Sequence, residues 1–245
     1  MTPPFPGPRL LIYHQVGTDL GREMEVATAV FSRQLDWLTA RGTIVDLEDA
    51  VARRGSPESS SLFVLTFDDG YADMFSAAYP QLRQRGLPFT LYLTSGPIQE
   101  ASPQAPGAEP LTWDQAREMY ASGLMTVGAH THSHPDLRSI DAASIADELR
   151  RSDELIEEQL GVRPLHFAYP KGYWAAPAEK LVAARYDTAV LGAGPPLTQS
   201  TNLYRLSRIP VQRSDGVYFF ARKMRRGMRL EEWARCRIKG YRNPS

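Results

Sequence analysis

Short apolar runs alternate with amphipathic stretches along most of the chain. The run Leu62-Phe63-Val64-Leu65 has no polar position, as expected of a strand buried on both faces, whereas Phe31, Leu35 and Leu38 recur at helical spacing. The strands expected from such runs cover residues 9–14, 43–45, 62–65, 88–93, 124–129, 165–169, 188–191 and 206–211. The helices expected between them cover residues 31–41, 47–53, 71–85, 112–122, 139–160 and 178–185. Strand–helix alternation without an internal linker predicts a single α/β domain, built as a parallel barrel or a closely related layout.

Two segments depart from this alternation. Residues 95–110 are rich in Pro, Gly and Ala and show no periodicity, so we expect a loop insertion that acts as a mobile lid or specificity loop. Residues 222–242 hold nine Lys or Arg and only two acidic residues, Glu231 and Glu232. The basic C-terminal segment, about residues 217–245, is interpreted as a solvated helix that closes the barrel. The alternative is a peripheral contact with an anionic membrane, or with an anionic lipid-linked sugar.

Composition argues against several classes of protein. The 28 Lys and Arg balance the 28 Asp and Glu, so no overall positive field predicts a nucleic-acid partner. The one cysteine, Cys236, cannot form an internal disulfide and is compatible with a reducing compartment. The N-terminus lacks the basic and apolar segments of a signal peptide, and the apolar run at residues 10–13 is too short to span a membrane. We therefore expect a cytoplasmic protein, and the sequence leaves its oligomeric state open.

The apolar run at residues 62–65 leads to two adjacent carboxylates, Asp68 and Asp69, followed by Gly70. One interpretation is a turn, since Asp and Gly both favour turns. The other is a catalytic site, because α/β barrels carry catalytic side chains at the ends of their strands. Two neighbouring buried carboxylates repel each other, so a metal ion or a proton usually has to stabilise them. The pair by itself does not decide between the two interpretations.

Three of the five histidines lie within residues 130–134, directly after an expected strand. His130 and His134 are four positions apart, and one helical turn would bring them to the same side, close enough to bind one ion. With the aspartate pair they supply two imidazoles and a carboxylate, which suit Zn²⁺ and also Co²⁺, Ni²⁺ or Fe²⁺. Three protein ligands leave a position open for water, as in catalytic sites. His132 is expected to point elsewhere.

Three motifs together resemble those of a known family. Thr66-Phe67-Asp68-Asp69-Gly70, His130-Thr131-His132-Ser133-His134-Pro135 and Phe167-Ala168-Tyr169-Pro170-Lys171-Gly172 resemble the successive motifs of the polysaccharide deacetylases. These are metal-dependent carbohydrate esterases that share a domain with the rhizobial chitooligosaccharide deacetylase. The resemblance extends from about residue 10 to about residue 211. It implies a distorted (β/α)7 barrel and the hydrolysis of N-acetyl groups, or less often O-acetyl groups, on sugars.

The resemblance also implies a role for each motif residue. Asp68 corresponds to the general base, and Asp69 corresponds to a metal ligand together with His130 and His134. A divalent ion acidifies water and polarises the amide carbonyl, which leaves Asp68 free to accept the water proton. The main-chain N–H of Lys171 corresponds to the donor that stabilises the oxyanion.

The same comparison yields candidate substrate-binding residues: Tyr169, Pro170, Trp174 and Arg208. In many relatives an arginine orients the base, but Ala168 stands at that position here, and Arg208 is a candidate replacement. The family's fourth motif, which contains a tryptophan, is not recognisable. Both departures fit a branch of the family in which the order of the motifs is permuted.

His14, at the end of the first expected strand, is open to two interpretations. From the residues alone it is either a satisfied histidine at the barrel rim or a histidine that faces a pocket. However, Tyr13-His14-Gln15-Val16 resembles the Tyr-His motif of the permuted poly-N-acetylglucosamine deacetylase branch, where this histidine protonates the leaving amine. No histidine follows His166, which we interpret as structural. The resemblance therefore implies that His14 is the catalytic acid.

The sequence thus predicts a metal-dependent enzyme, with Zn²⁺ as the favoured ion. It would remove N-acetyl groups from an amino-sugar saccharide in an exopolysaccharide or cell-envelope glycan pathway. An O-acetyl esterase, or a deformylase of a lipid-linked sugar, would keep the site and change the substrate. A non-enzymatic carbohydrate-binding module is disfavoured, because a dead relative would be expected to lack the base or a ligand, and all four of these residues are present.

Overall fold

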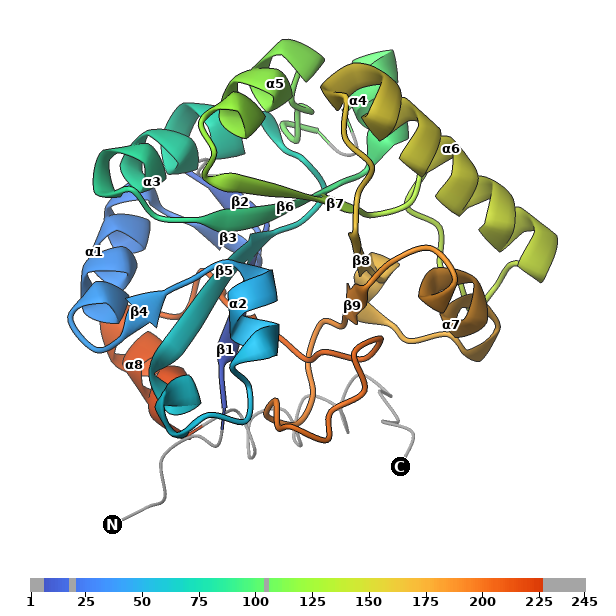
Figure 1. Cartoon of the computed structure of the whole chain (residues 1–245). Coiled ribbons are helices and arrows are strands. Elements are labelled where there is room, and N and C mark those ends of the chain that lie inside the picture. Colours follow the sequence, from blue (N-terminus) through green and yellow to red (C-terminus); the bar gives the residue numbers. More distant parts are fainter. Residues whose placement is uncertain (1–6, 18–20, 104–105, 227–245) are drawn as a thin grey trace.

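The computed structural model describes residues 7–17, 21–103 and 106–226 of the 245-residue chain, in which strands and helices alternate (Figure 1). The strands are β1 (Arg9–Tyr13), β2 (Gln15–Val16), β3 (Glu25–Val26), β4 (Thr43–Ile44), β5 (Leu62–Phe67), β6 (Phe89–Leu93), β7 (Met125–Ala129), β8 (His166–Ala168), β9 (Thr188–Val190) and β10 (Ile209–Pro210). The α-helices are α1 (Thr28–Thr39), α2 (Leu47–Ala52), α3 (Tyr79–Arg85), α4 (Ser95–Glu100), α5 (Trp113–Ala121), α6 (Ala142–Leu160), α7 (Ala176–Ala183) and α8 (Val217–Arg226). None of the helices in these ranges is long and apolar enough to cross a membrane.

One parallel sheet organises the domain. Among the described residues, its strands follow the order β10-β1-β5-β6-β7-β8-β9, with β4 beside β5. Leu11 of β1, for example, pairs with Leu65 of β5 on one side and with Ile209 of β10 on the other. Beyond β9, Val190 bridges to Leu206, so the segment that leads into β10 curls the sheet back toward β1. The fold is therefore of the predicted (β/α)7 barrel type.

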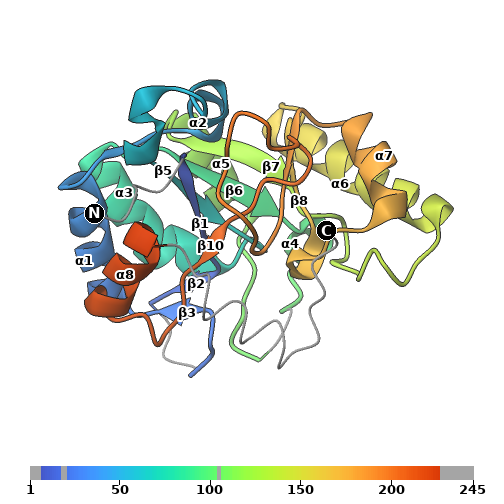
Figure 2. The same ribbon diagram turned by 90° about the horizontal axis from the view of Figure 1, so that it is seen from below.

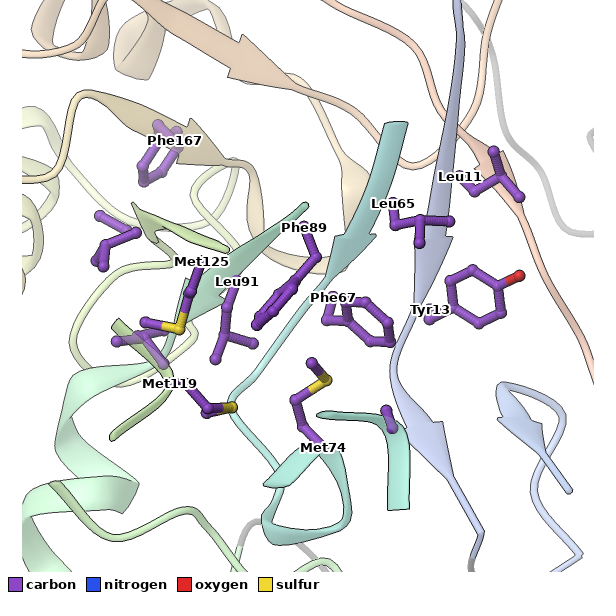
Figure 3. Close-up of a cluster of buried hydrophobic side chains, with 14 of the residues drawn as sticks. Leu11, Tyr13, Leu65, Phe67, Met74, Phe89, Leu91, Met119, Met125 and Phe167 are labelled. Carbon is purple, nitrogen blue, oxygen red and sulfur yellow. The ribbon is translucent and has the colours of Figure 1, made fainter. Parts of the chain in front are cut away.

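Both faces of the sheet are buried, which explains why its strands are mostly apolar, with only single polar residues such as Thr66 and Thr90 inside them. In β5, Leu65 and Phe67 belong to a large cluster that also contains helix residues, whereas Val64 belongs to a smaller cluster inside the barrel. Figure 3 shows part of the larger cluster, where strand side chains contact methionines such as Met74 and Met119. The inner cluster also contains Leu47 and Ala50 of α2. The barrel interior is thus a packed core.

One helix lies where composition predicts only loop. Within residues 95–110, Ser95–Glu100 forms α4, so this part of the predicted loop insertion is wrong. Gly96 and Ile98 are buried, and a Cβ on Gly96 would lie 2.7 Å from the main-chain oxygen of His132. The helix therefore packs directly against the histidine-bearing loop, and this tertiary contact stabilises a segment with low intrinsic helix propensity.

The parallel sheet collects the carboxyl ends of its strands at one edge, which is where α/β proteins bind ligands. Strands β1, β5, β7 and β8 are followed at this edge by His14, Asp68, His130 and Tyr169, respectively. The carboxyl end of β10 lies at the same edge and leads toward α8, which packs beside α1 (Figure 2). The topology therefore brings together residues that are more than a hundred positions apart.

Candidate active site

Three side chains converge at the carboxyl edge: Asp69 after β5, and His130 and His134 after β7. Asp69 Oδ1 lies 3.5 Å from His130 Nε2 and 3.6 Å from His134 Nε2. One ligand atom from each residue lies within 4.8 Å of the others. Asp69 and His130 are buried, whereas the His134 side chain is 25% exposed. The cluster is therefore buried on the side of Asp69 and His130, and solvent can reach it on the side of His134.

The orientation of His130 is fixed by the neighbouring strand. Its Nδ1 lies 2.7 Å from the carbonyl oxygen of Ala168, which can only accept a hydrogen bond. Nδ1 therefore carries the proton, and the Nε2 lone pair is directed to the cluster. Burial lowers the pKa of His134 to about 4, helped by the neighbouring His130 and opposed by Asp69 and Asp68. At neutral pH His134 is thus in the uncharged form that binds metal ions.

The backbone around the cluster takes conformations that are rare for residues with a side chain. Asp69 has a φ of 72°, Thr131 of 65° and His134 of 58°. The helical turn expected for His130 and His134 is therefore wrong, because residues 130–134 form an irregular loop. Left-handed residues in this loop, rather than helical periodicity, bring the two imidazoles together. Such strained positions persist only where the surroundings over-determine them.

Part of that support comes from α6, through the side chain of Glu148. Its Oε2 accepts hydrogen bonds from the main-chain N–H groups of His132 and Ser133, at 3.0 and 2.8 Å. The His132 ring points away from the cluster: its Nδ1 lies 3.0 Å from Ser95 Oγ and its Nε2 lies 2.6 Å from Arg151 Nη2. His132 thus supports the loop and is not a ligand, as the sequence predicts.

Asp68 is held by an arginine from a distant part of the chain. Arg208 Nη1 and Nη2 donate to the two oxygens of Asp68, at 2.6 and 2.7 Å. The other donors of Arg208 reach Thr66 Oγ1 at 3.1 Å and the carbonyl oxygen of Leu191 at 2.8 Å. Arg208 thus contacts the carboxylate that, according to the resemblance, an arginine at the position of Ala168 orients in many relatives. The residue as a whole is only 1% exposed and these donors are engaged within the protein, which argues against its prediction as a substrate-binding residue.

The surroundings of Asp68 keep it ionised. Burial raises the pKa of a carboxyl group, but Arg208, together with His130 and His14, outweighs burial and holds the pKa of Asp68 at about 2. Asp68 Oδ2 lies 3.9 Å from His130 Nε2. The site therefore contains a fixed carboxylate directly beside the potential metal ligands.

His14 belongs to the same site. It directly follows β1, whose last residue, Tyr13, pairs with Phe67 immediately before Asp68. Its Nδ1 is buried and has no hydrogen-bond partner among the described residues. His14 is also close enough to Asp68 and His134 to lower the pKa of each. A rim histidine satisfied by its neighbours does not fit these observations.

The Tyr169–Gly172 turn has a demanding backbone geometry. Lys171 has a φ of 60° and Gly172 a φ of 71°. A Cβ on Gly172 would lie 2.6 Å from the Cα of Gly192, so only glycine fits here. Tyr169 and Pro170 are buried, which argues against their prediction as direct substrate contacts. They shape the turn, while the role of the Lys171 N–H stays a prediction.

Trp174 is the remaining predicted substrate-binding residue and is half-buried. Its indole N–H donates to Glu179, and the guanidinium of Arg205 lies 4.2 Å from the ring centroid. Arg205 also donates to both oxygens of Glu179. Trp174 is therefore held in place with part of its surface open to solvent.

Tyr71 is a site residue that the sequence reasoning missed. Its hydroxyl hydrogen-bonds to Asp69, and burial together with that carboxylate raises the pKa of Tyr71, so it remains a donor. Its position directly after Gly70 in the first motif is the feature of the sequence that could have identified it.

His166 lies away from the site, inside β8, with Nδ1 2.9 Å from Thr188 Oγ1 and Nε2 3.4 Å from Glu48 Oε1. These contacts agree with a structural role for His166.

The donor set fits a divalent ion. Two imidazole nitrogens and one carboxylate oxygen are ligands that Zn²⁺ and its neighbours in the first transition row accept. The Ala168 carbonyl fixes the His130 ring and the Tyr71 hydroxyl contacts Asp69, as the outer partners of metal ligands do. Three ligands also leave coordination positions for water and substrate.

Fold and site together define a class of protein: an α/β barrel with a three-residue candidate metal site and a fixed carboxylate at its carboxyl edge. The sequence model of the polysaccharide deacetylase family matches residues 55–189, more than half of the chain. The protein therefore belongs to the polysaccharide deacetylase family.

Individual relatives agree with this assignment. The chain is 26% identical to the Bacillus subtilis protein YxkH over 208 residues, which cover 82% of this chain and 70% of YxkH. It is 28% identical to the poly-beta-1,6-N-acetyl-D-glucosamine N-deacetylase of Escherichia coli K12 over 137 residues, 51% of this chain but only 20% of that enzyme. The solved structure of the Streptococcus pyogenes deacetylase PplD in complex with acetate superposes with a TM-score of 0.78, at 22% identity, over 89% of this chain and 98% of PplD. This last similarity supports the fold.

Proposed function

We propose that this protein is a metal-dependent hydrolase that removes N-acetyl groups from an amino-sugar saccharide. The observation that carries the proposal is the juxtaposition of Asp68, fixed by Arg208, with the cluster of Asp69, His130 and His134. A carboxylate that is not itself a ligand, next to a three-ligand site, is the arrangement that water activation requires.

Each residue of the site would have one task. A divalent ion held by Asp69, His130 and His134 would polarise the acetyl carbonyl and make the attacking water more acidic. Asp68, ionised and fixed in orientation, accepts the proton of that water. The Lys171 N–H donates to the oxyanion that develops on the acetyl oxygen. His14 donates a proton to the leaving nitrogen, so that water and amide yield acetate and a free amine.

An amide substrate accounts for His14 better than an acetate ester does. An amine leaves only after protonation, whereas an alkoxide leaving group depends less on an acid. His14 Nδ1 is buried and has no hydrogen-bond partner among the described residues, so no contact of that atom commits the ring to another role. The saccharide part rests on the similarity to an enzyme named for its action on poly-N-acetylglucosamine, together with the family. Among metal ions, Zn²⁺ suits two neutral imidazoles and a carboxylate best.

The test is acetate release from a panel of substrates by the purified full chain, reconstituted with Zn²⁺, Co²⁺, Ni²⁺ or Fe²⁺ after removal of metal by a chelator. The panel contains N-acetylglucosamine oligomers, O-acetylated sugars, lipid-linked N-acetyl sugars and N-formyl analogues. We expect metal-dependent acetate release from an N-acetyl saccharide. A protein that cleaves only O-acetyl or N-formyl substrates would contradict the N-deacetylase assignment, and equal activity without metal would contradict the metal dependence.

Two variants test the assigned roles. His134→Ala should lose bound metal and activity together, as measured by metal analysis and acetate release. His14→Ala should keep the metal and slow amide hydrolysis much more than hydrolysis of an activated acetate ester, whose leaving group needs no proton. Equal slowing of both reactions would exclude His14 as the acid. His166→Gln is the matched histidine control, since His166 contacts Thr188 and Glu48 and not the cluster.

A further inference from the structure

The outer face of α8 carries side chains that the catalytic site does not use. Tyr218 is 74% exposed, Phe219 is 47% exposed and Val217 is 36% exposed. Arg222 and Arg225 are also exposed and follow Tyr218 at four and seven positions, which places all three on one stripe of the helix. Large apolar side chains and cations thus alternate on one solvent-facing surface.

The inner face of the same helix is firmly anchored. Phe220 and Met224 are 0% and 1% exposed, and the Phe220 ring lies 5.8 Å from that of Trp37 on α1. Lys223, also buried, donates to Asp215 and to the carbonyl oxygen of Pro210, the latter at 3.1 Å. These contacts fix the rotation of α8. The exposed aromatics therefore cannot turn inward without breaking a buried ion pair.

The patch lies toward the edge of the sheet that bears the active site. β10 runs parallel to β1, so the segment after β10 leaves from the carboxyl edge, as His14 does. In this segment the Arg213 N–H donates to the carbonyl oxygen of Glu23 at 2.8 Å, which ties it to the chain that follows His14. Figure 2 shows the start of α8 on the same side as β2 and β3. The Arg213 side chain is 50% exposed, but its Nη1 lies 3.9 Å from Glu25 Oε2, so this cation already has an acidic partner.

We propose that Val217, Tyr218 and Phe219, with Arg222 and Arg225, form a patch that binds the surface of an anionic lipid bilayer. Aromatic side chains favour the bilayer interface, and arginine favours lipid phosphate. The net charge of the whole chain is zero, so attraction to an anionic surface has to come from a local group of cations. With the patch in contact, the active-site edge lies close to the membrane surface.

This inference goes beyond the proposed function and does not rest on it. Its test is flotation of the full-length protein with vesicles of neutral phosphatidylcholine, or with vesicles that also contain phosphatidylglycerol. We expect binding to the anionic vesicles alone, and weaker binding as salt is raised. Tyr218→Ser with Phe219→Ser should reduce the partition coefficient at least tenfold. Arg222→Glu with Arg225→Glu should reduce it at least 25-fold, about fivefold for each arginine.

Matched controls come from three other helices, α3, α5 and α6. Tyr120→Ser removes an exposed aromatic residue of α5, and Arg83→Glu with Arg150→Glu reverses two exposed charges away from α8. These variants should bind anionic vesicles like the wild type. Acetate release from a water-soluble ester should be unchanged in the patch variants, which shows that they are folded. If the Tyr218→Ser, Phe219→Ser variant fails to fold, the Arg222→Glu, Arg225→Glu variant still tests the proposal.

Several results would overturn the proposal. Equal binding to neutral and anionic vesicles would show that the arginines do not attract the protein to anionic lipid. Wild-type binding by both patch variants would show that the patch is not the membrane-binding surface. Loss of binding on deletion of residues 227–245, with the patch variants unaffected, would assign the contact to that segment instead. A dimer in light scattering that Tyr218→Ser dissolves, with no vesicle binding, would show that a second copy covers this face.

Discussion

Two buried ion pairs of the described residues lie close to the carboxyl edge of the sheet, and one of them borders the cluster of Asp69, His130 and His134. Arg208 holds Asp68 inside the barrel, and Lys223 holds Asp215 beneath α8. The four side chains are 0%, 3%, 4% and 5% exposed, respectively. Both cations also donate to a main-chain carbonyl. The two ion pairs therefore do not differ in burial or in the kind of partners that their cations have.

Their neighbours differ. Asp68 faces His130 Nε2 at 3.9 Å, within a site whose ligand atoms are directed toward a common point. The main-chain oxygen of Asp215 accepts from Gln34, which in turn accepts from the Tyr13 hydroxyl, so the second pair is surrounded by groups that are already engaged. A buried, paired carboxylate is therefore not in itself a sign of catalysis. Asp68 differs from Asp215 because it lies next to the imidazole and carboxylate groups of the cluster formed by Asp69, His130 and His134.

The largest expected contrast comes from neutralising each carboxylate. Asp68→Asn should lower the rate of acetate release by about 10²–10⁴-fold with metal content unchanged, because the base is lost and the ligands are not. Asp215→Asn should leave the rate of the folded protein within a few-fold of wild type. Each variant strands a buried cation, so each should lose about 3–5 kcal/mol of unfolding free energy. Denaturant titration with metal analysis and kinetics separates the two effects, and near-wild-type activity of Asp68→Asn would exclude it as the base.

Removing the cations sharpens the contrast. Arg208→Met should slow acetate release about 10²-fold, because Asp68 loses the two hydrogen bonds that orient it. Lys223→Met should destabilise the protein by a similar amount to Arg208→Met, about 3–5 kcal/mol, without this rate loss. Steady-state kinetics at a temperature where both variants are folded provides the measurement. Equal rate losses would mean that both pairs act only through stability.

A smaller effect, on metal affinity, is expected from the hydrogen bond between Tyr71 and Asp69, which is not an ion pair. Tyr71→Phe removes the hydroxyl that hydrogen-bonds to Asp69. We expect metal affinity to fall about 10–100-fold, since outer partners of metal ligands have effects of this size. Competition with a chromogenic chelator measures the affinity independently of catalysis. Tyr79→Phe is the control, because the Tyr79 hydroxyl is buried without a hydrogen-bond partner among the described residues.

The most subtle difference is in pH dependence. The pKa of Asp68 is about 2 in the folded protein, below the ordinary value of 3.8. The stability that this shift contributes is therefore present above about pH 4 and is lost as the pH falls through about 2. Without Arg208, burial would raise the pKa of Asp68, so the acidic limb of kcat/KM in Arg208→Met should move to higher pH. In Lys223→Met the limb should stay in place, and a pH–rate profile of both variants checks this.

Much of the fold was predictable from the chain itself. Apolar runs such as residues 62–65 and helical repeats such as Phe31, Leu35 and Leu38 reflect the periods of strand and helix, which are local properties. Helix α4 was not predictable, because Ser95–Glu100 has poor helix formers and is stabilised by its contact with the loop at His132.

The candidate site also contains features that were predictable from local sequence and features that depend on tertiary contacts. The first two motifs by themselves located Asp68, Asp69, His130 and His134, since each set lies within a few residues directly after a strand. The expected helical turn at His130–His134 was wrong, because the positive φ angles of Thr131 and His134 depend on support from Glu148. Arg208 was a candidate by elimination, but no spacing rule links it to Asp68, 140 positions away.

The sequence by itself therefore determined the alternation of strands and helices, the chemistry of the ligands, and their place at strand ends. These features depend on neighbours along the chain. The tertiary structure alone decided which cation pairs with which buried carboxylate, which backbone angles hold the histidine loop, and that α8 turns Tyr218 and Phe219 outward. The physical reason is that these features arise only when the parallel sheet closes and brings distant strand ends to one edge.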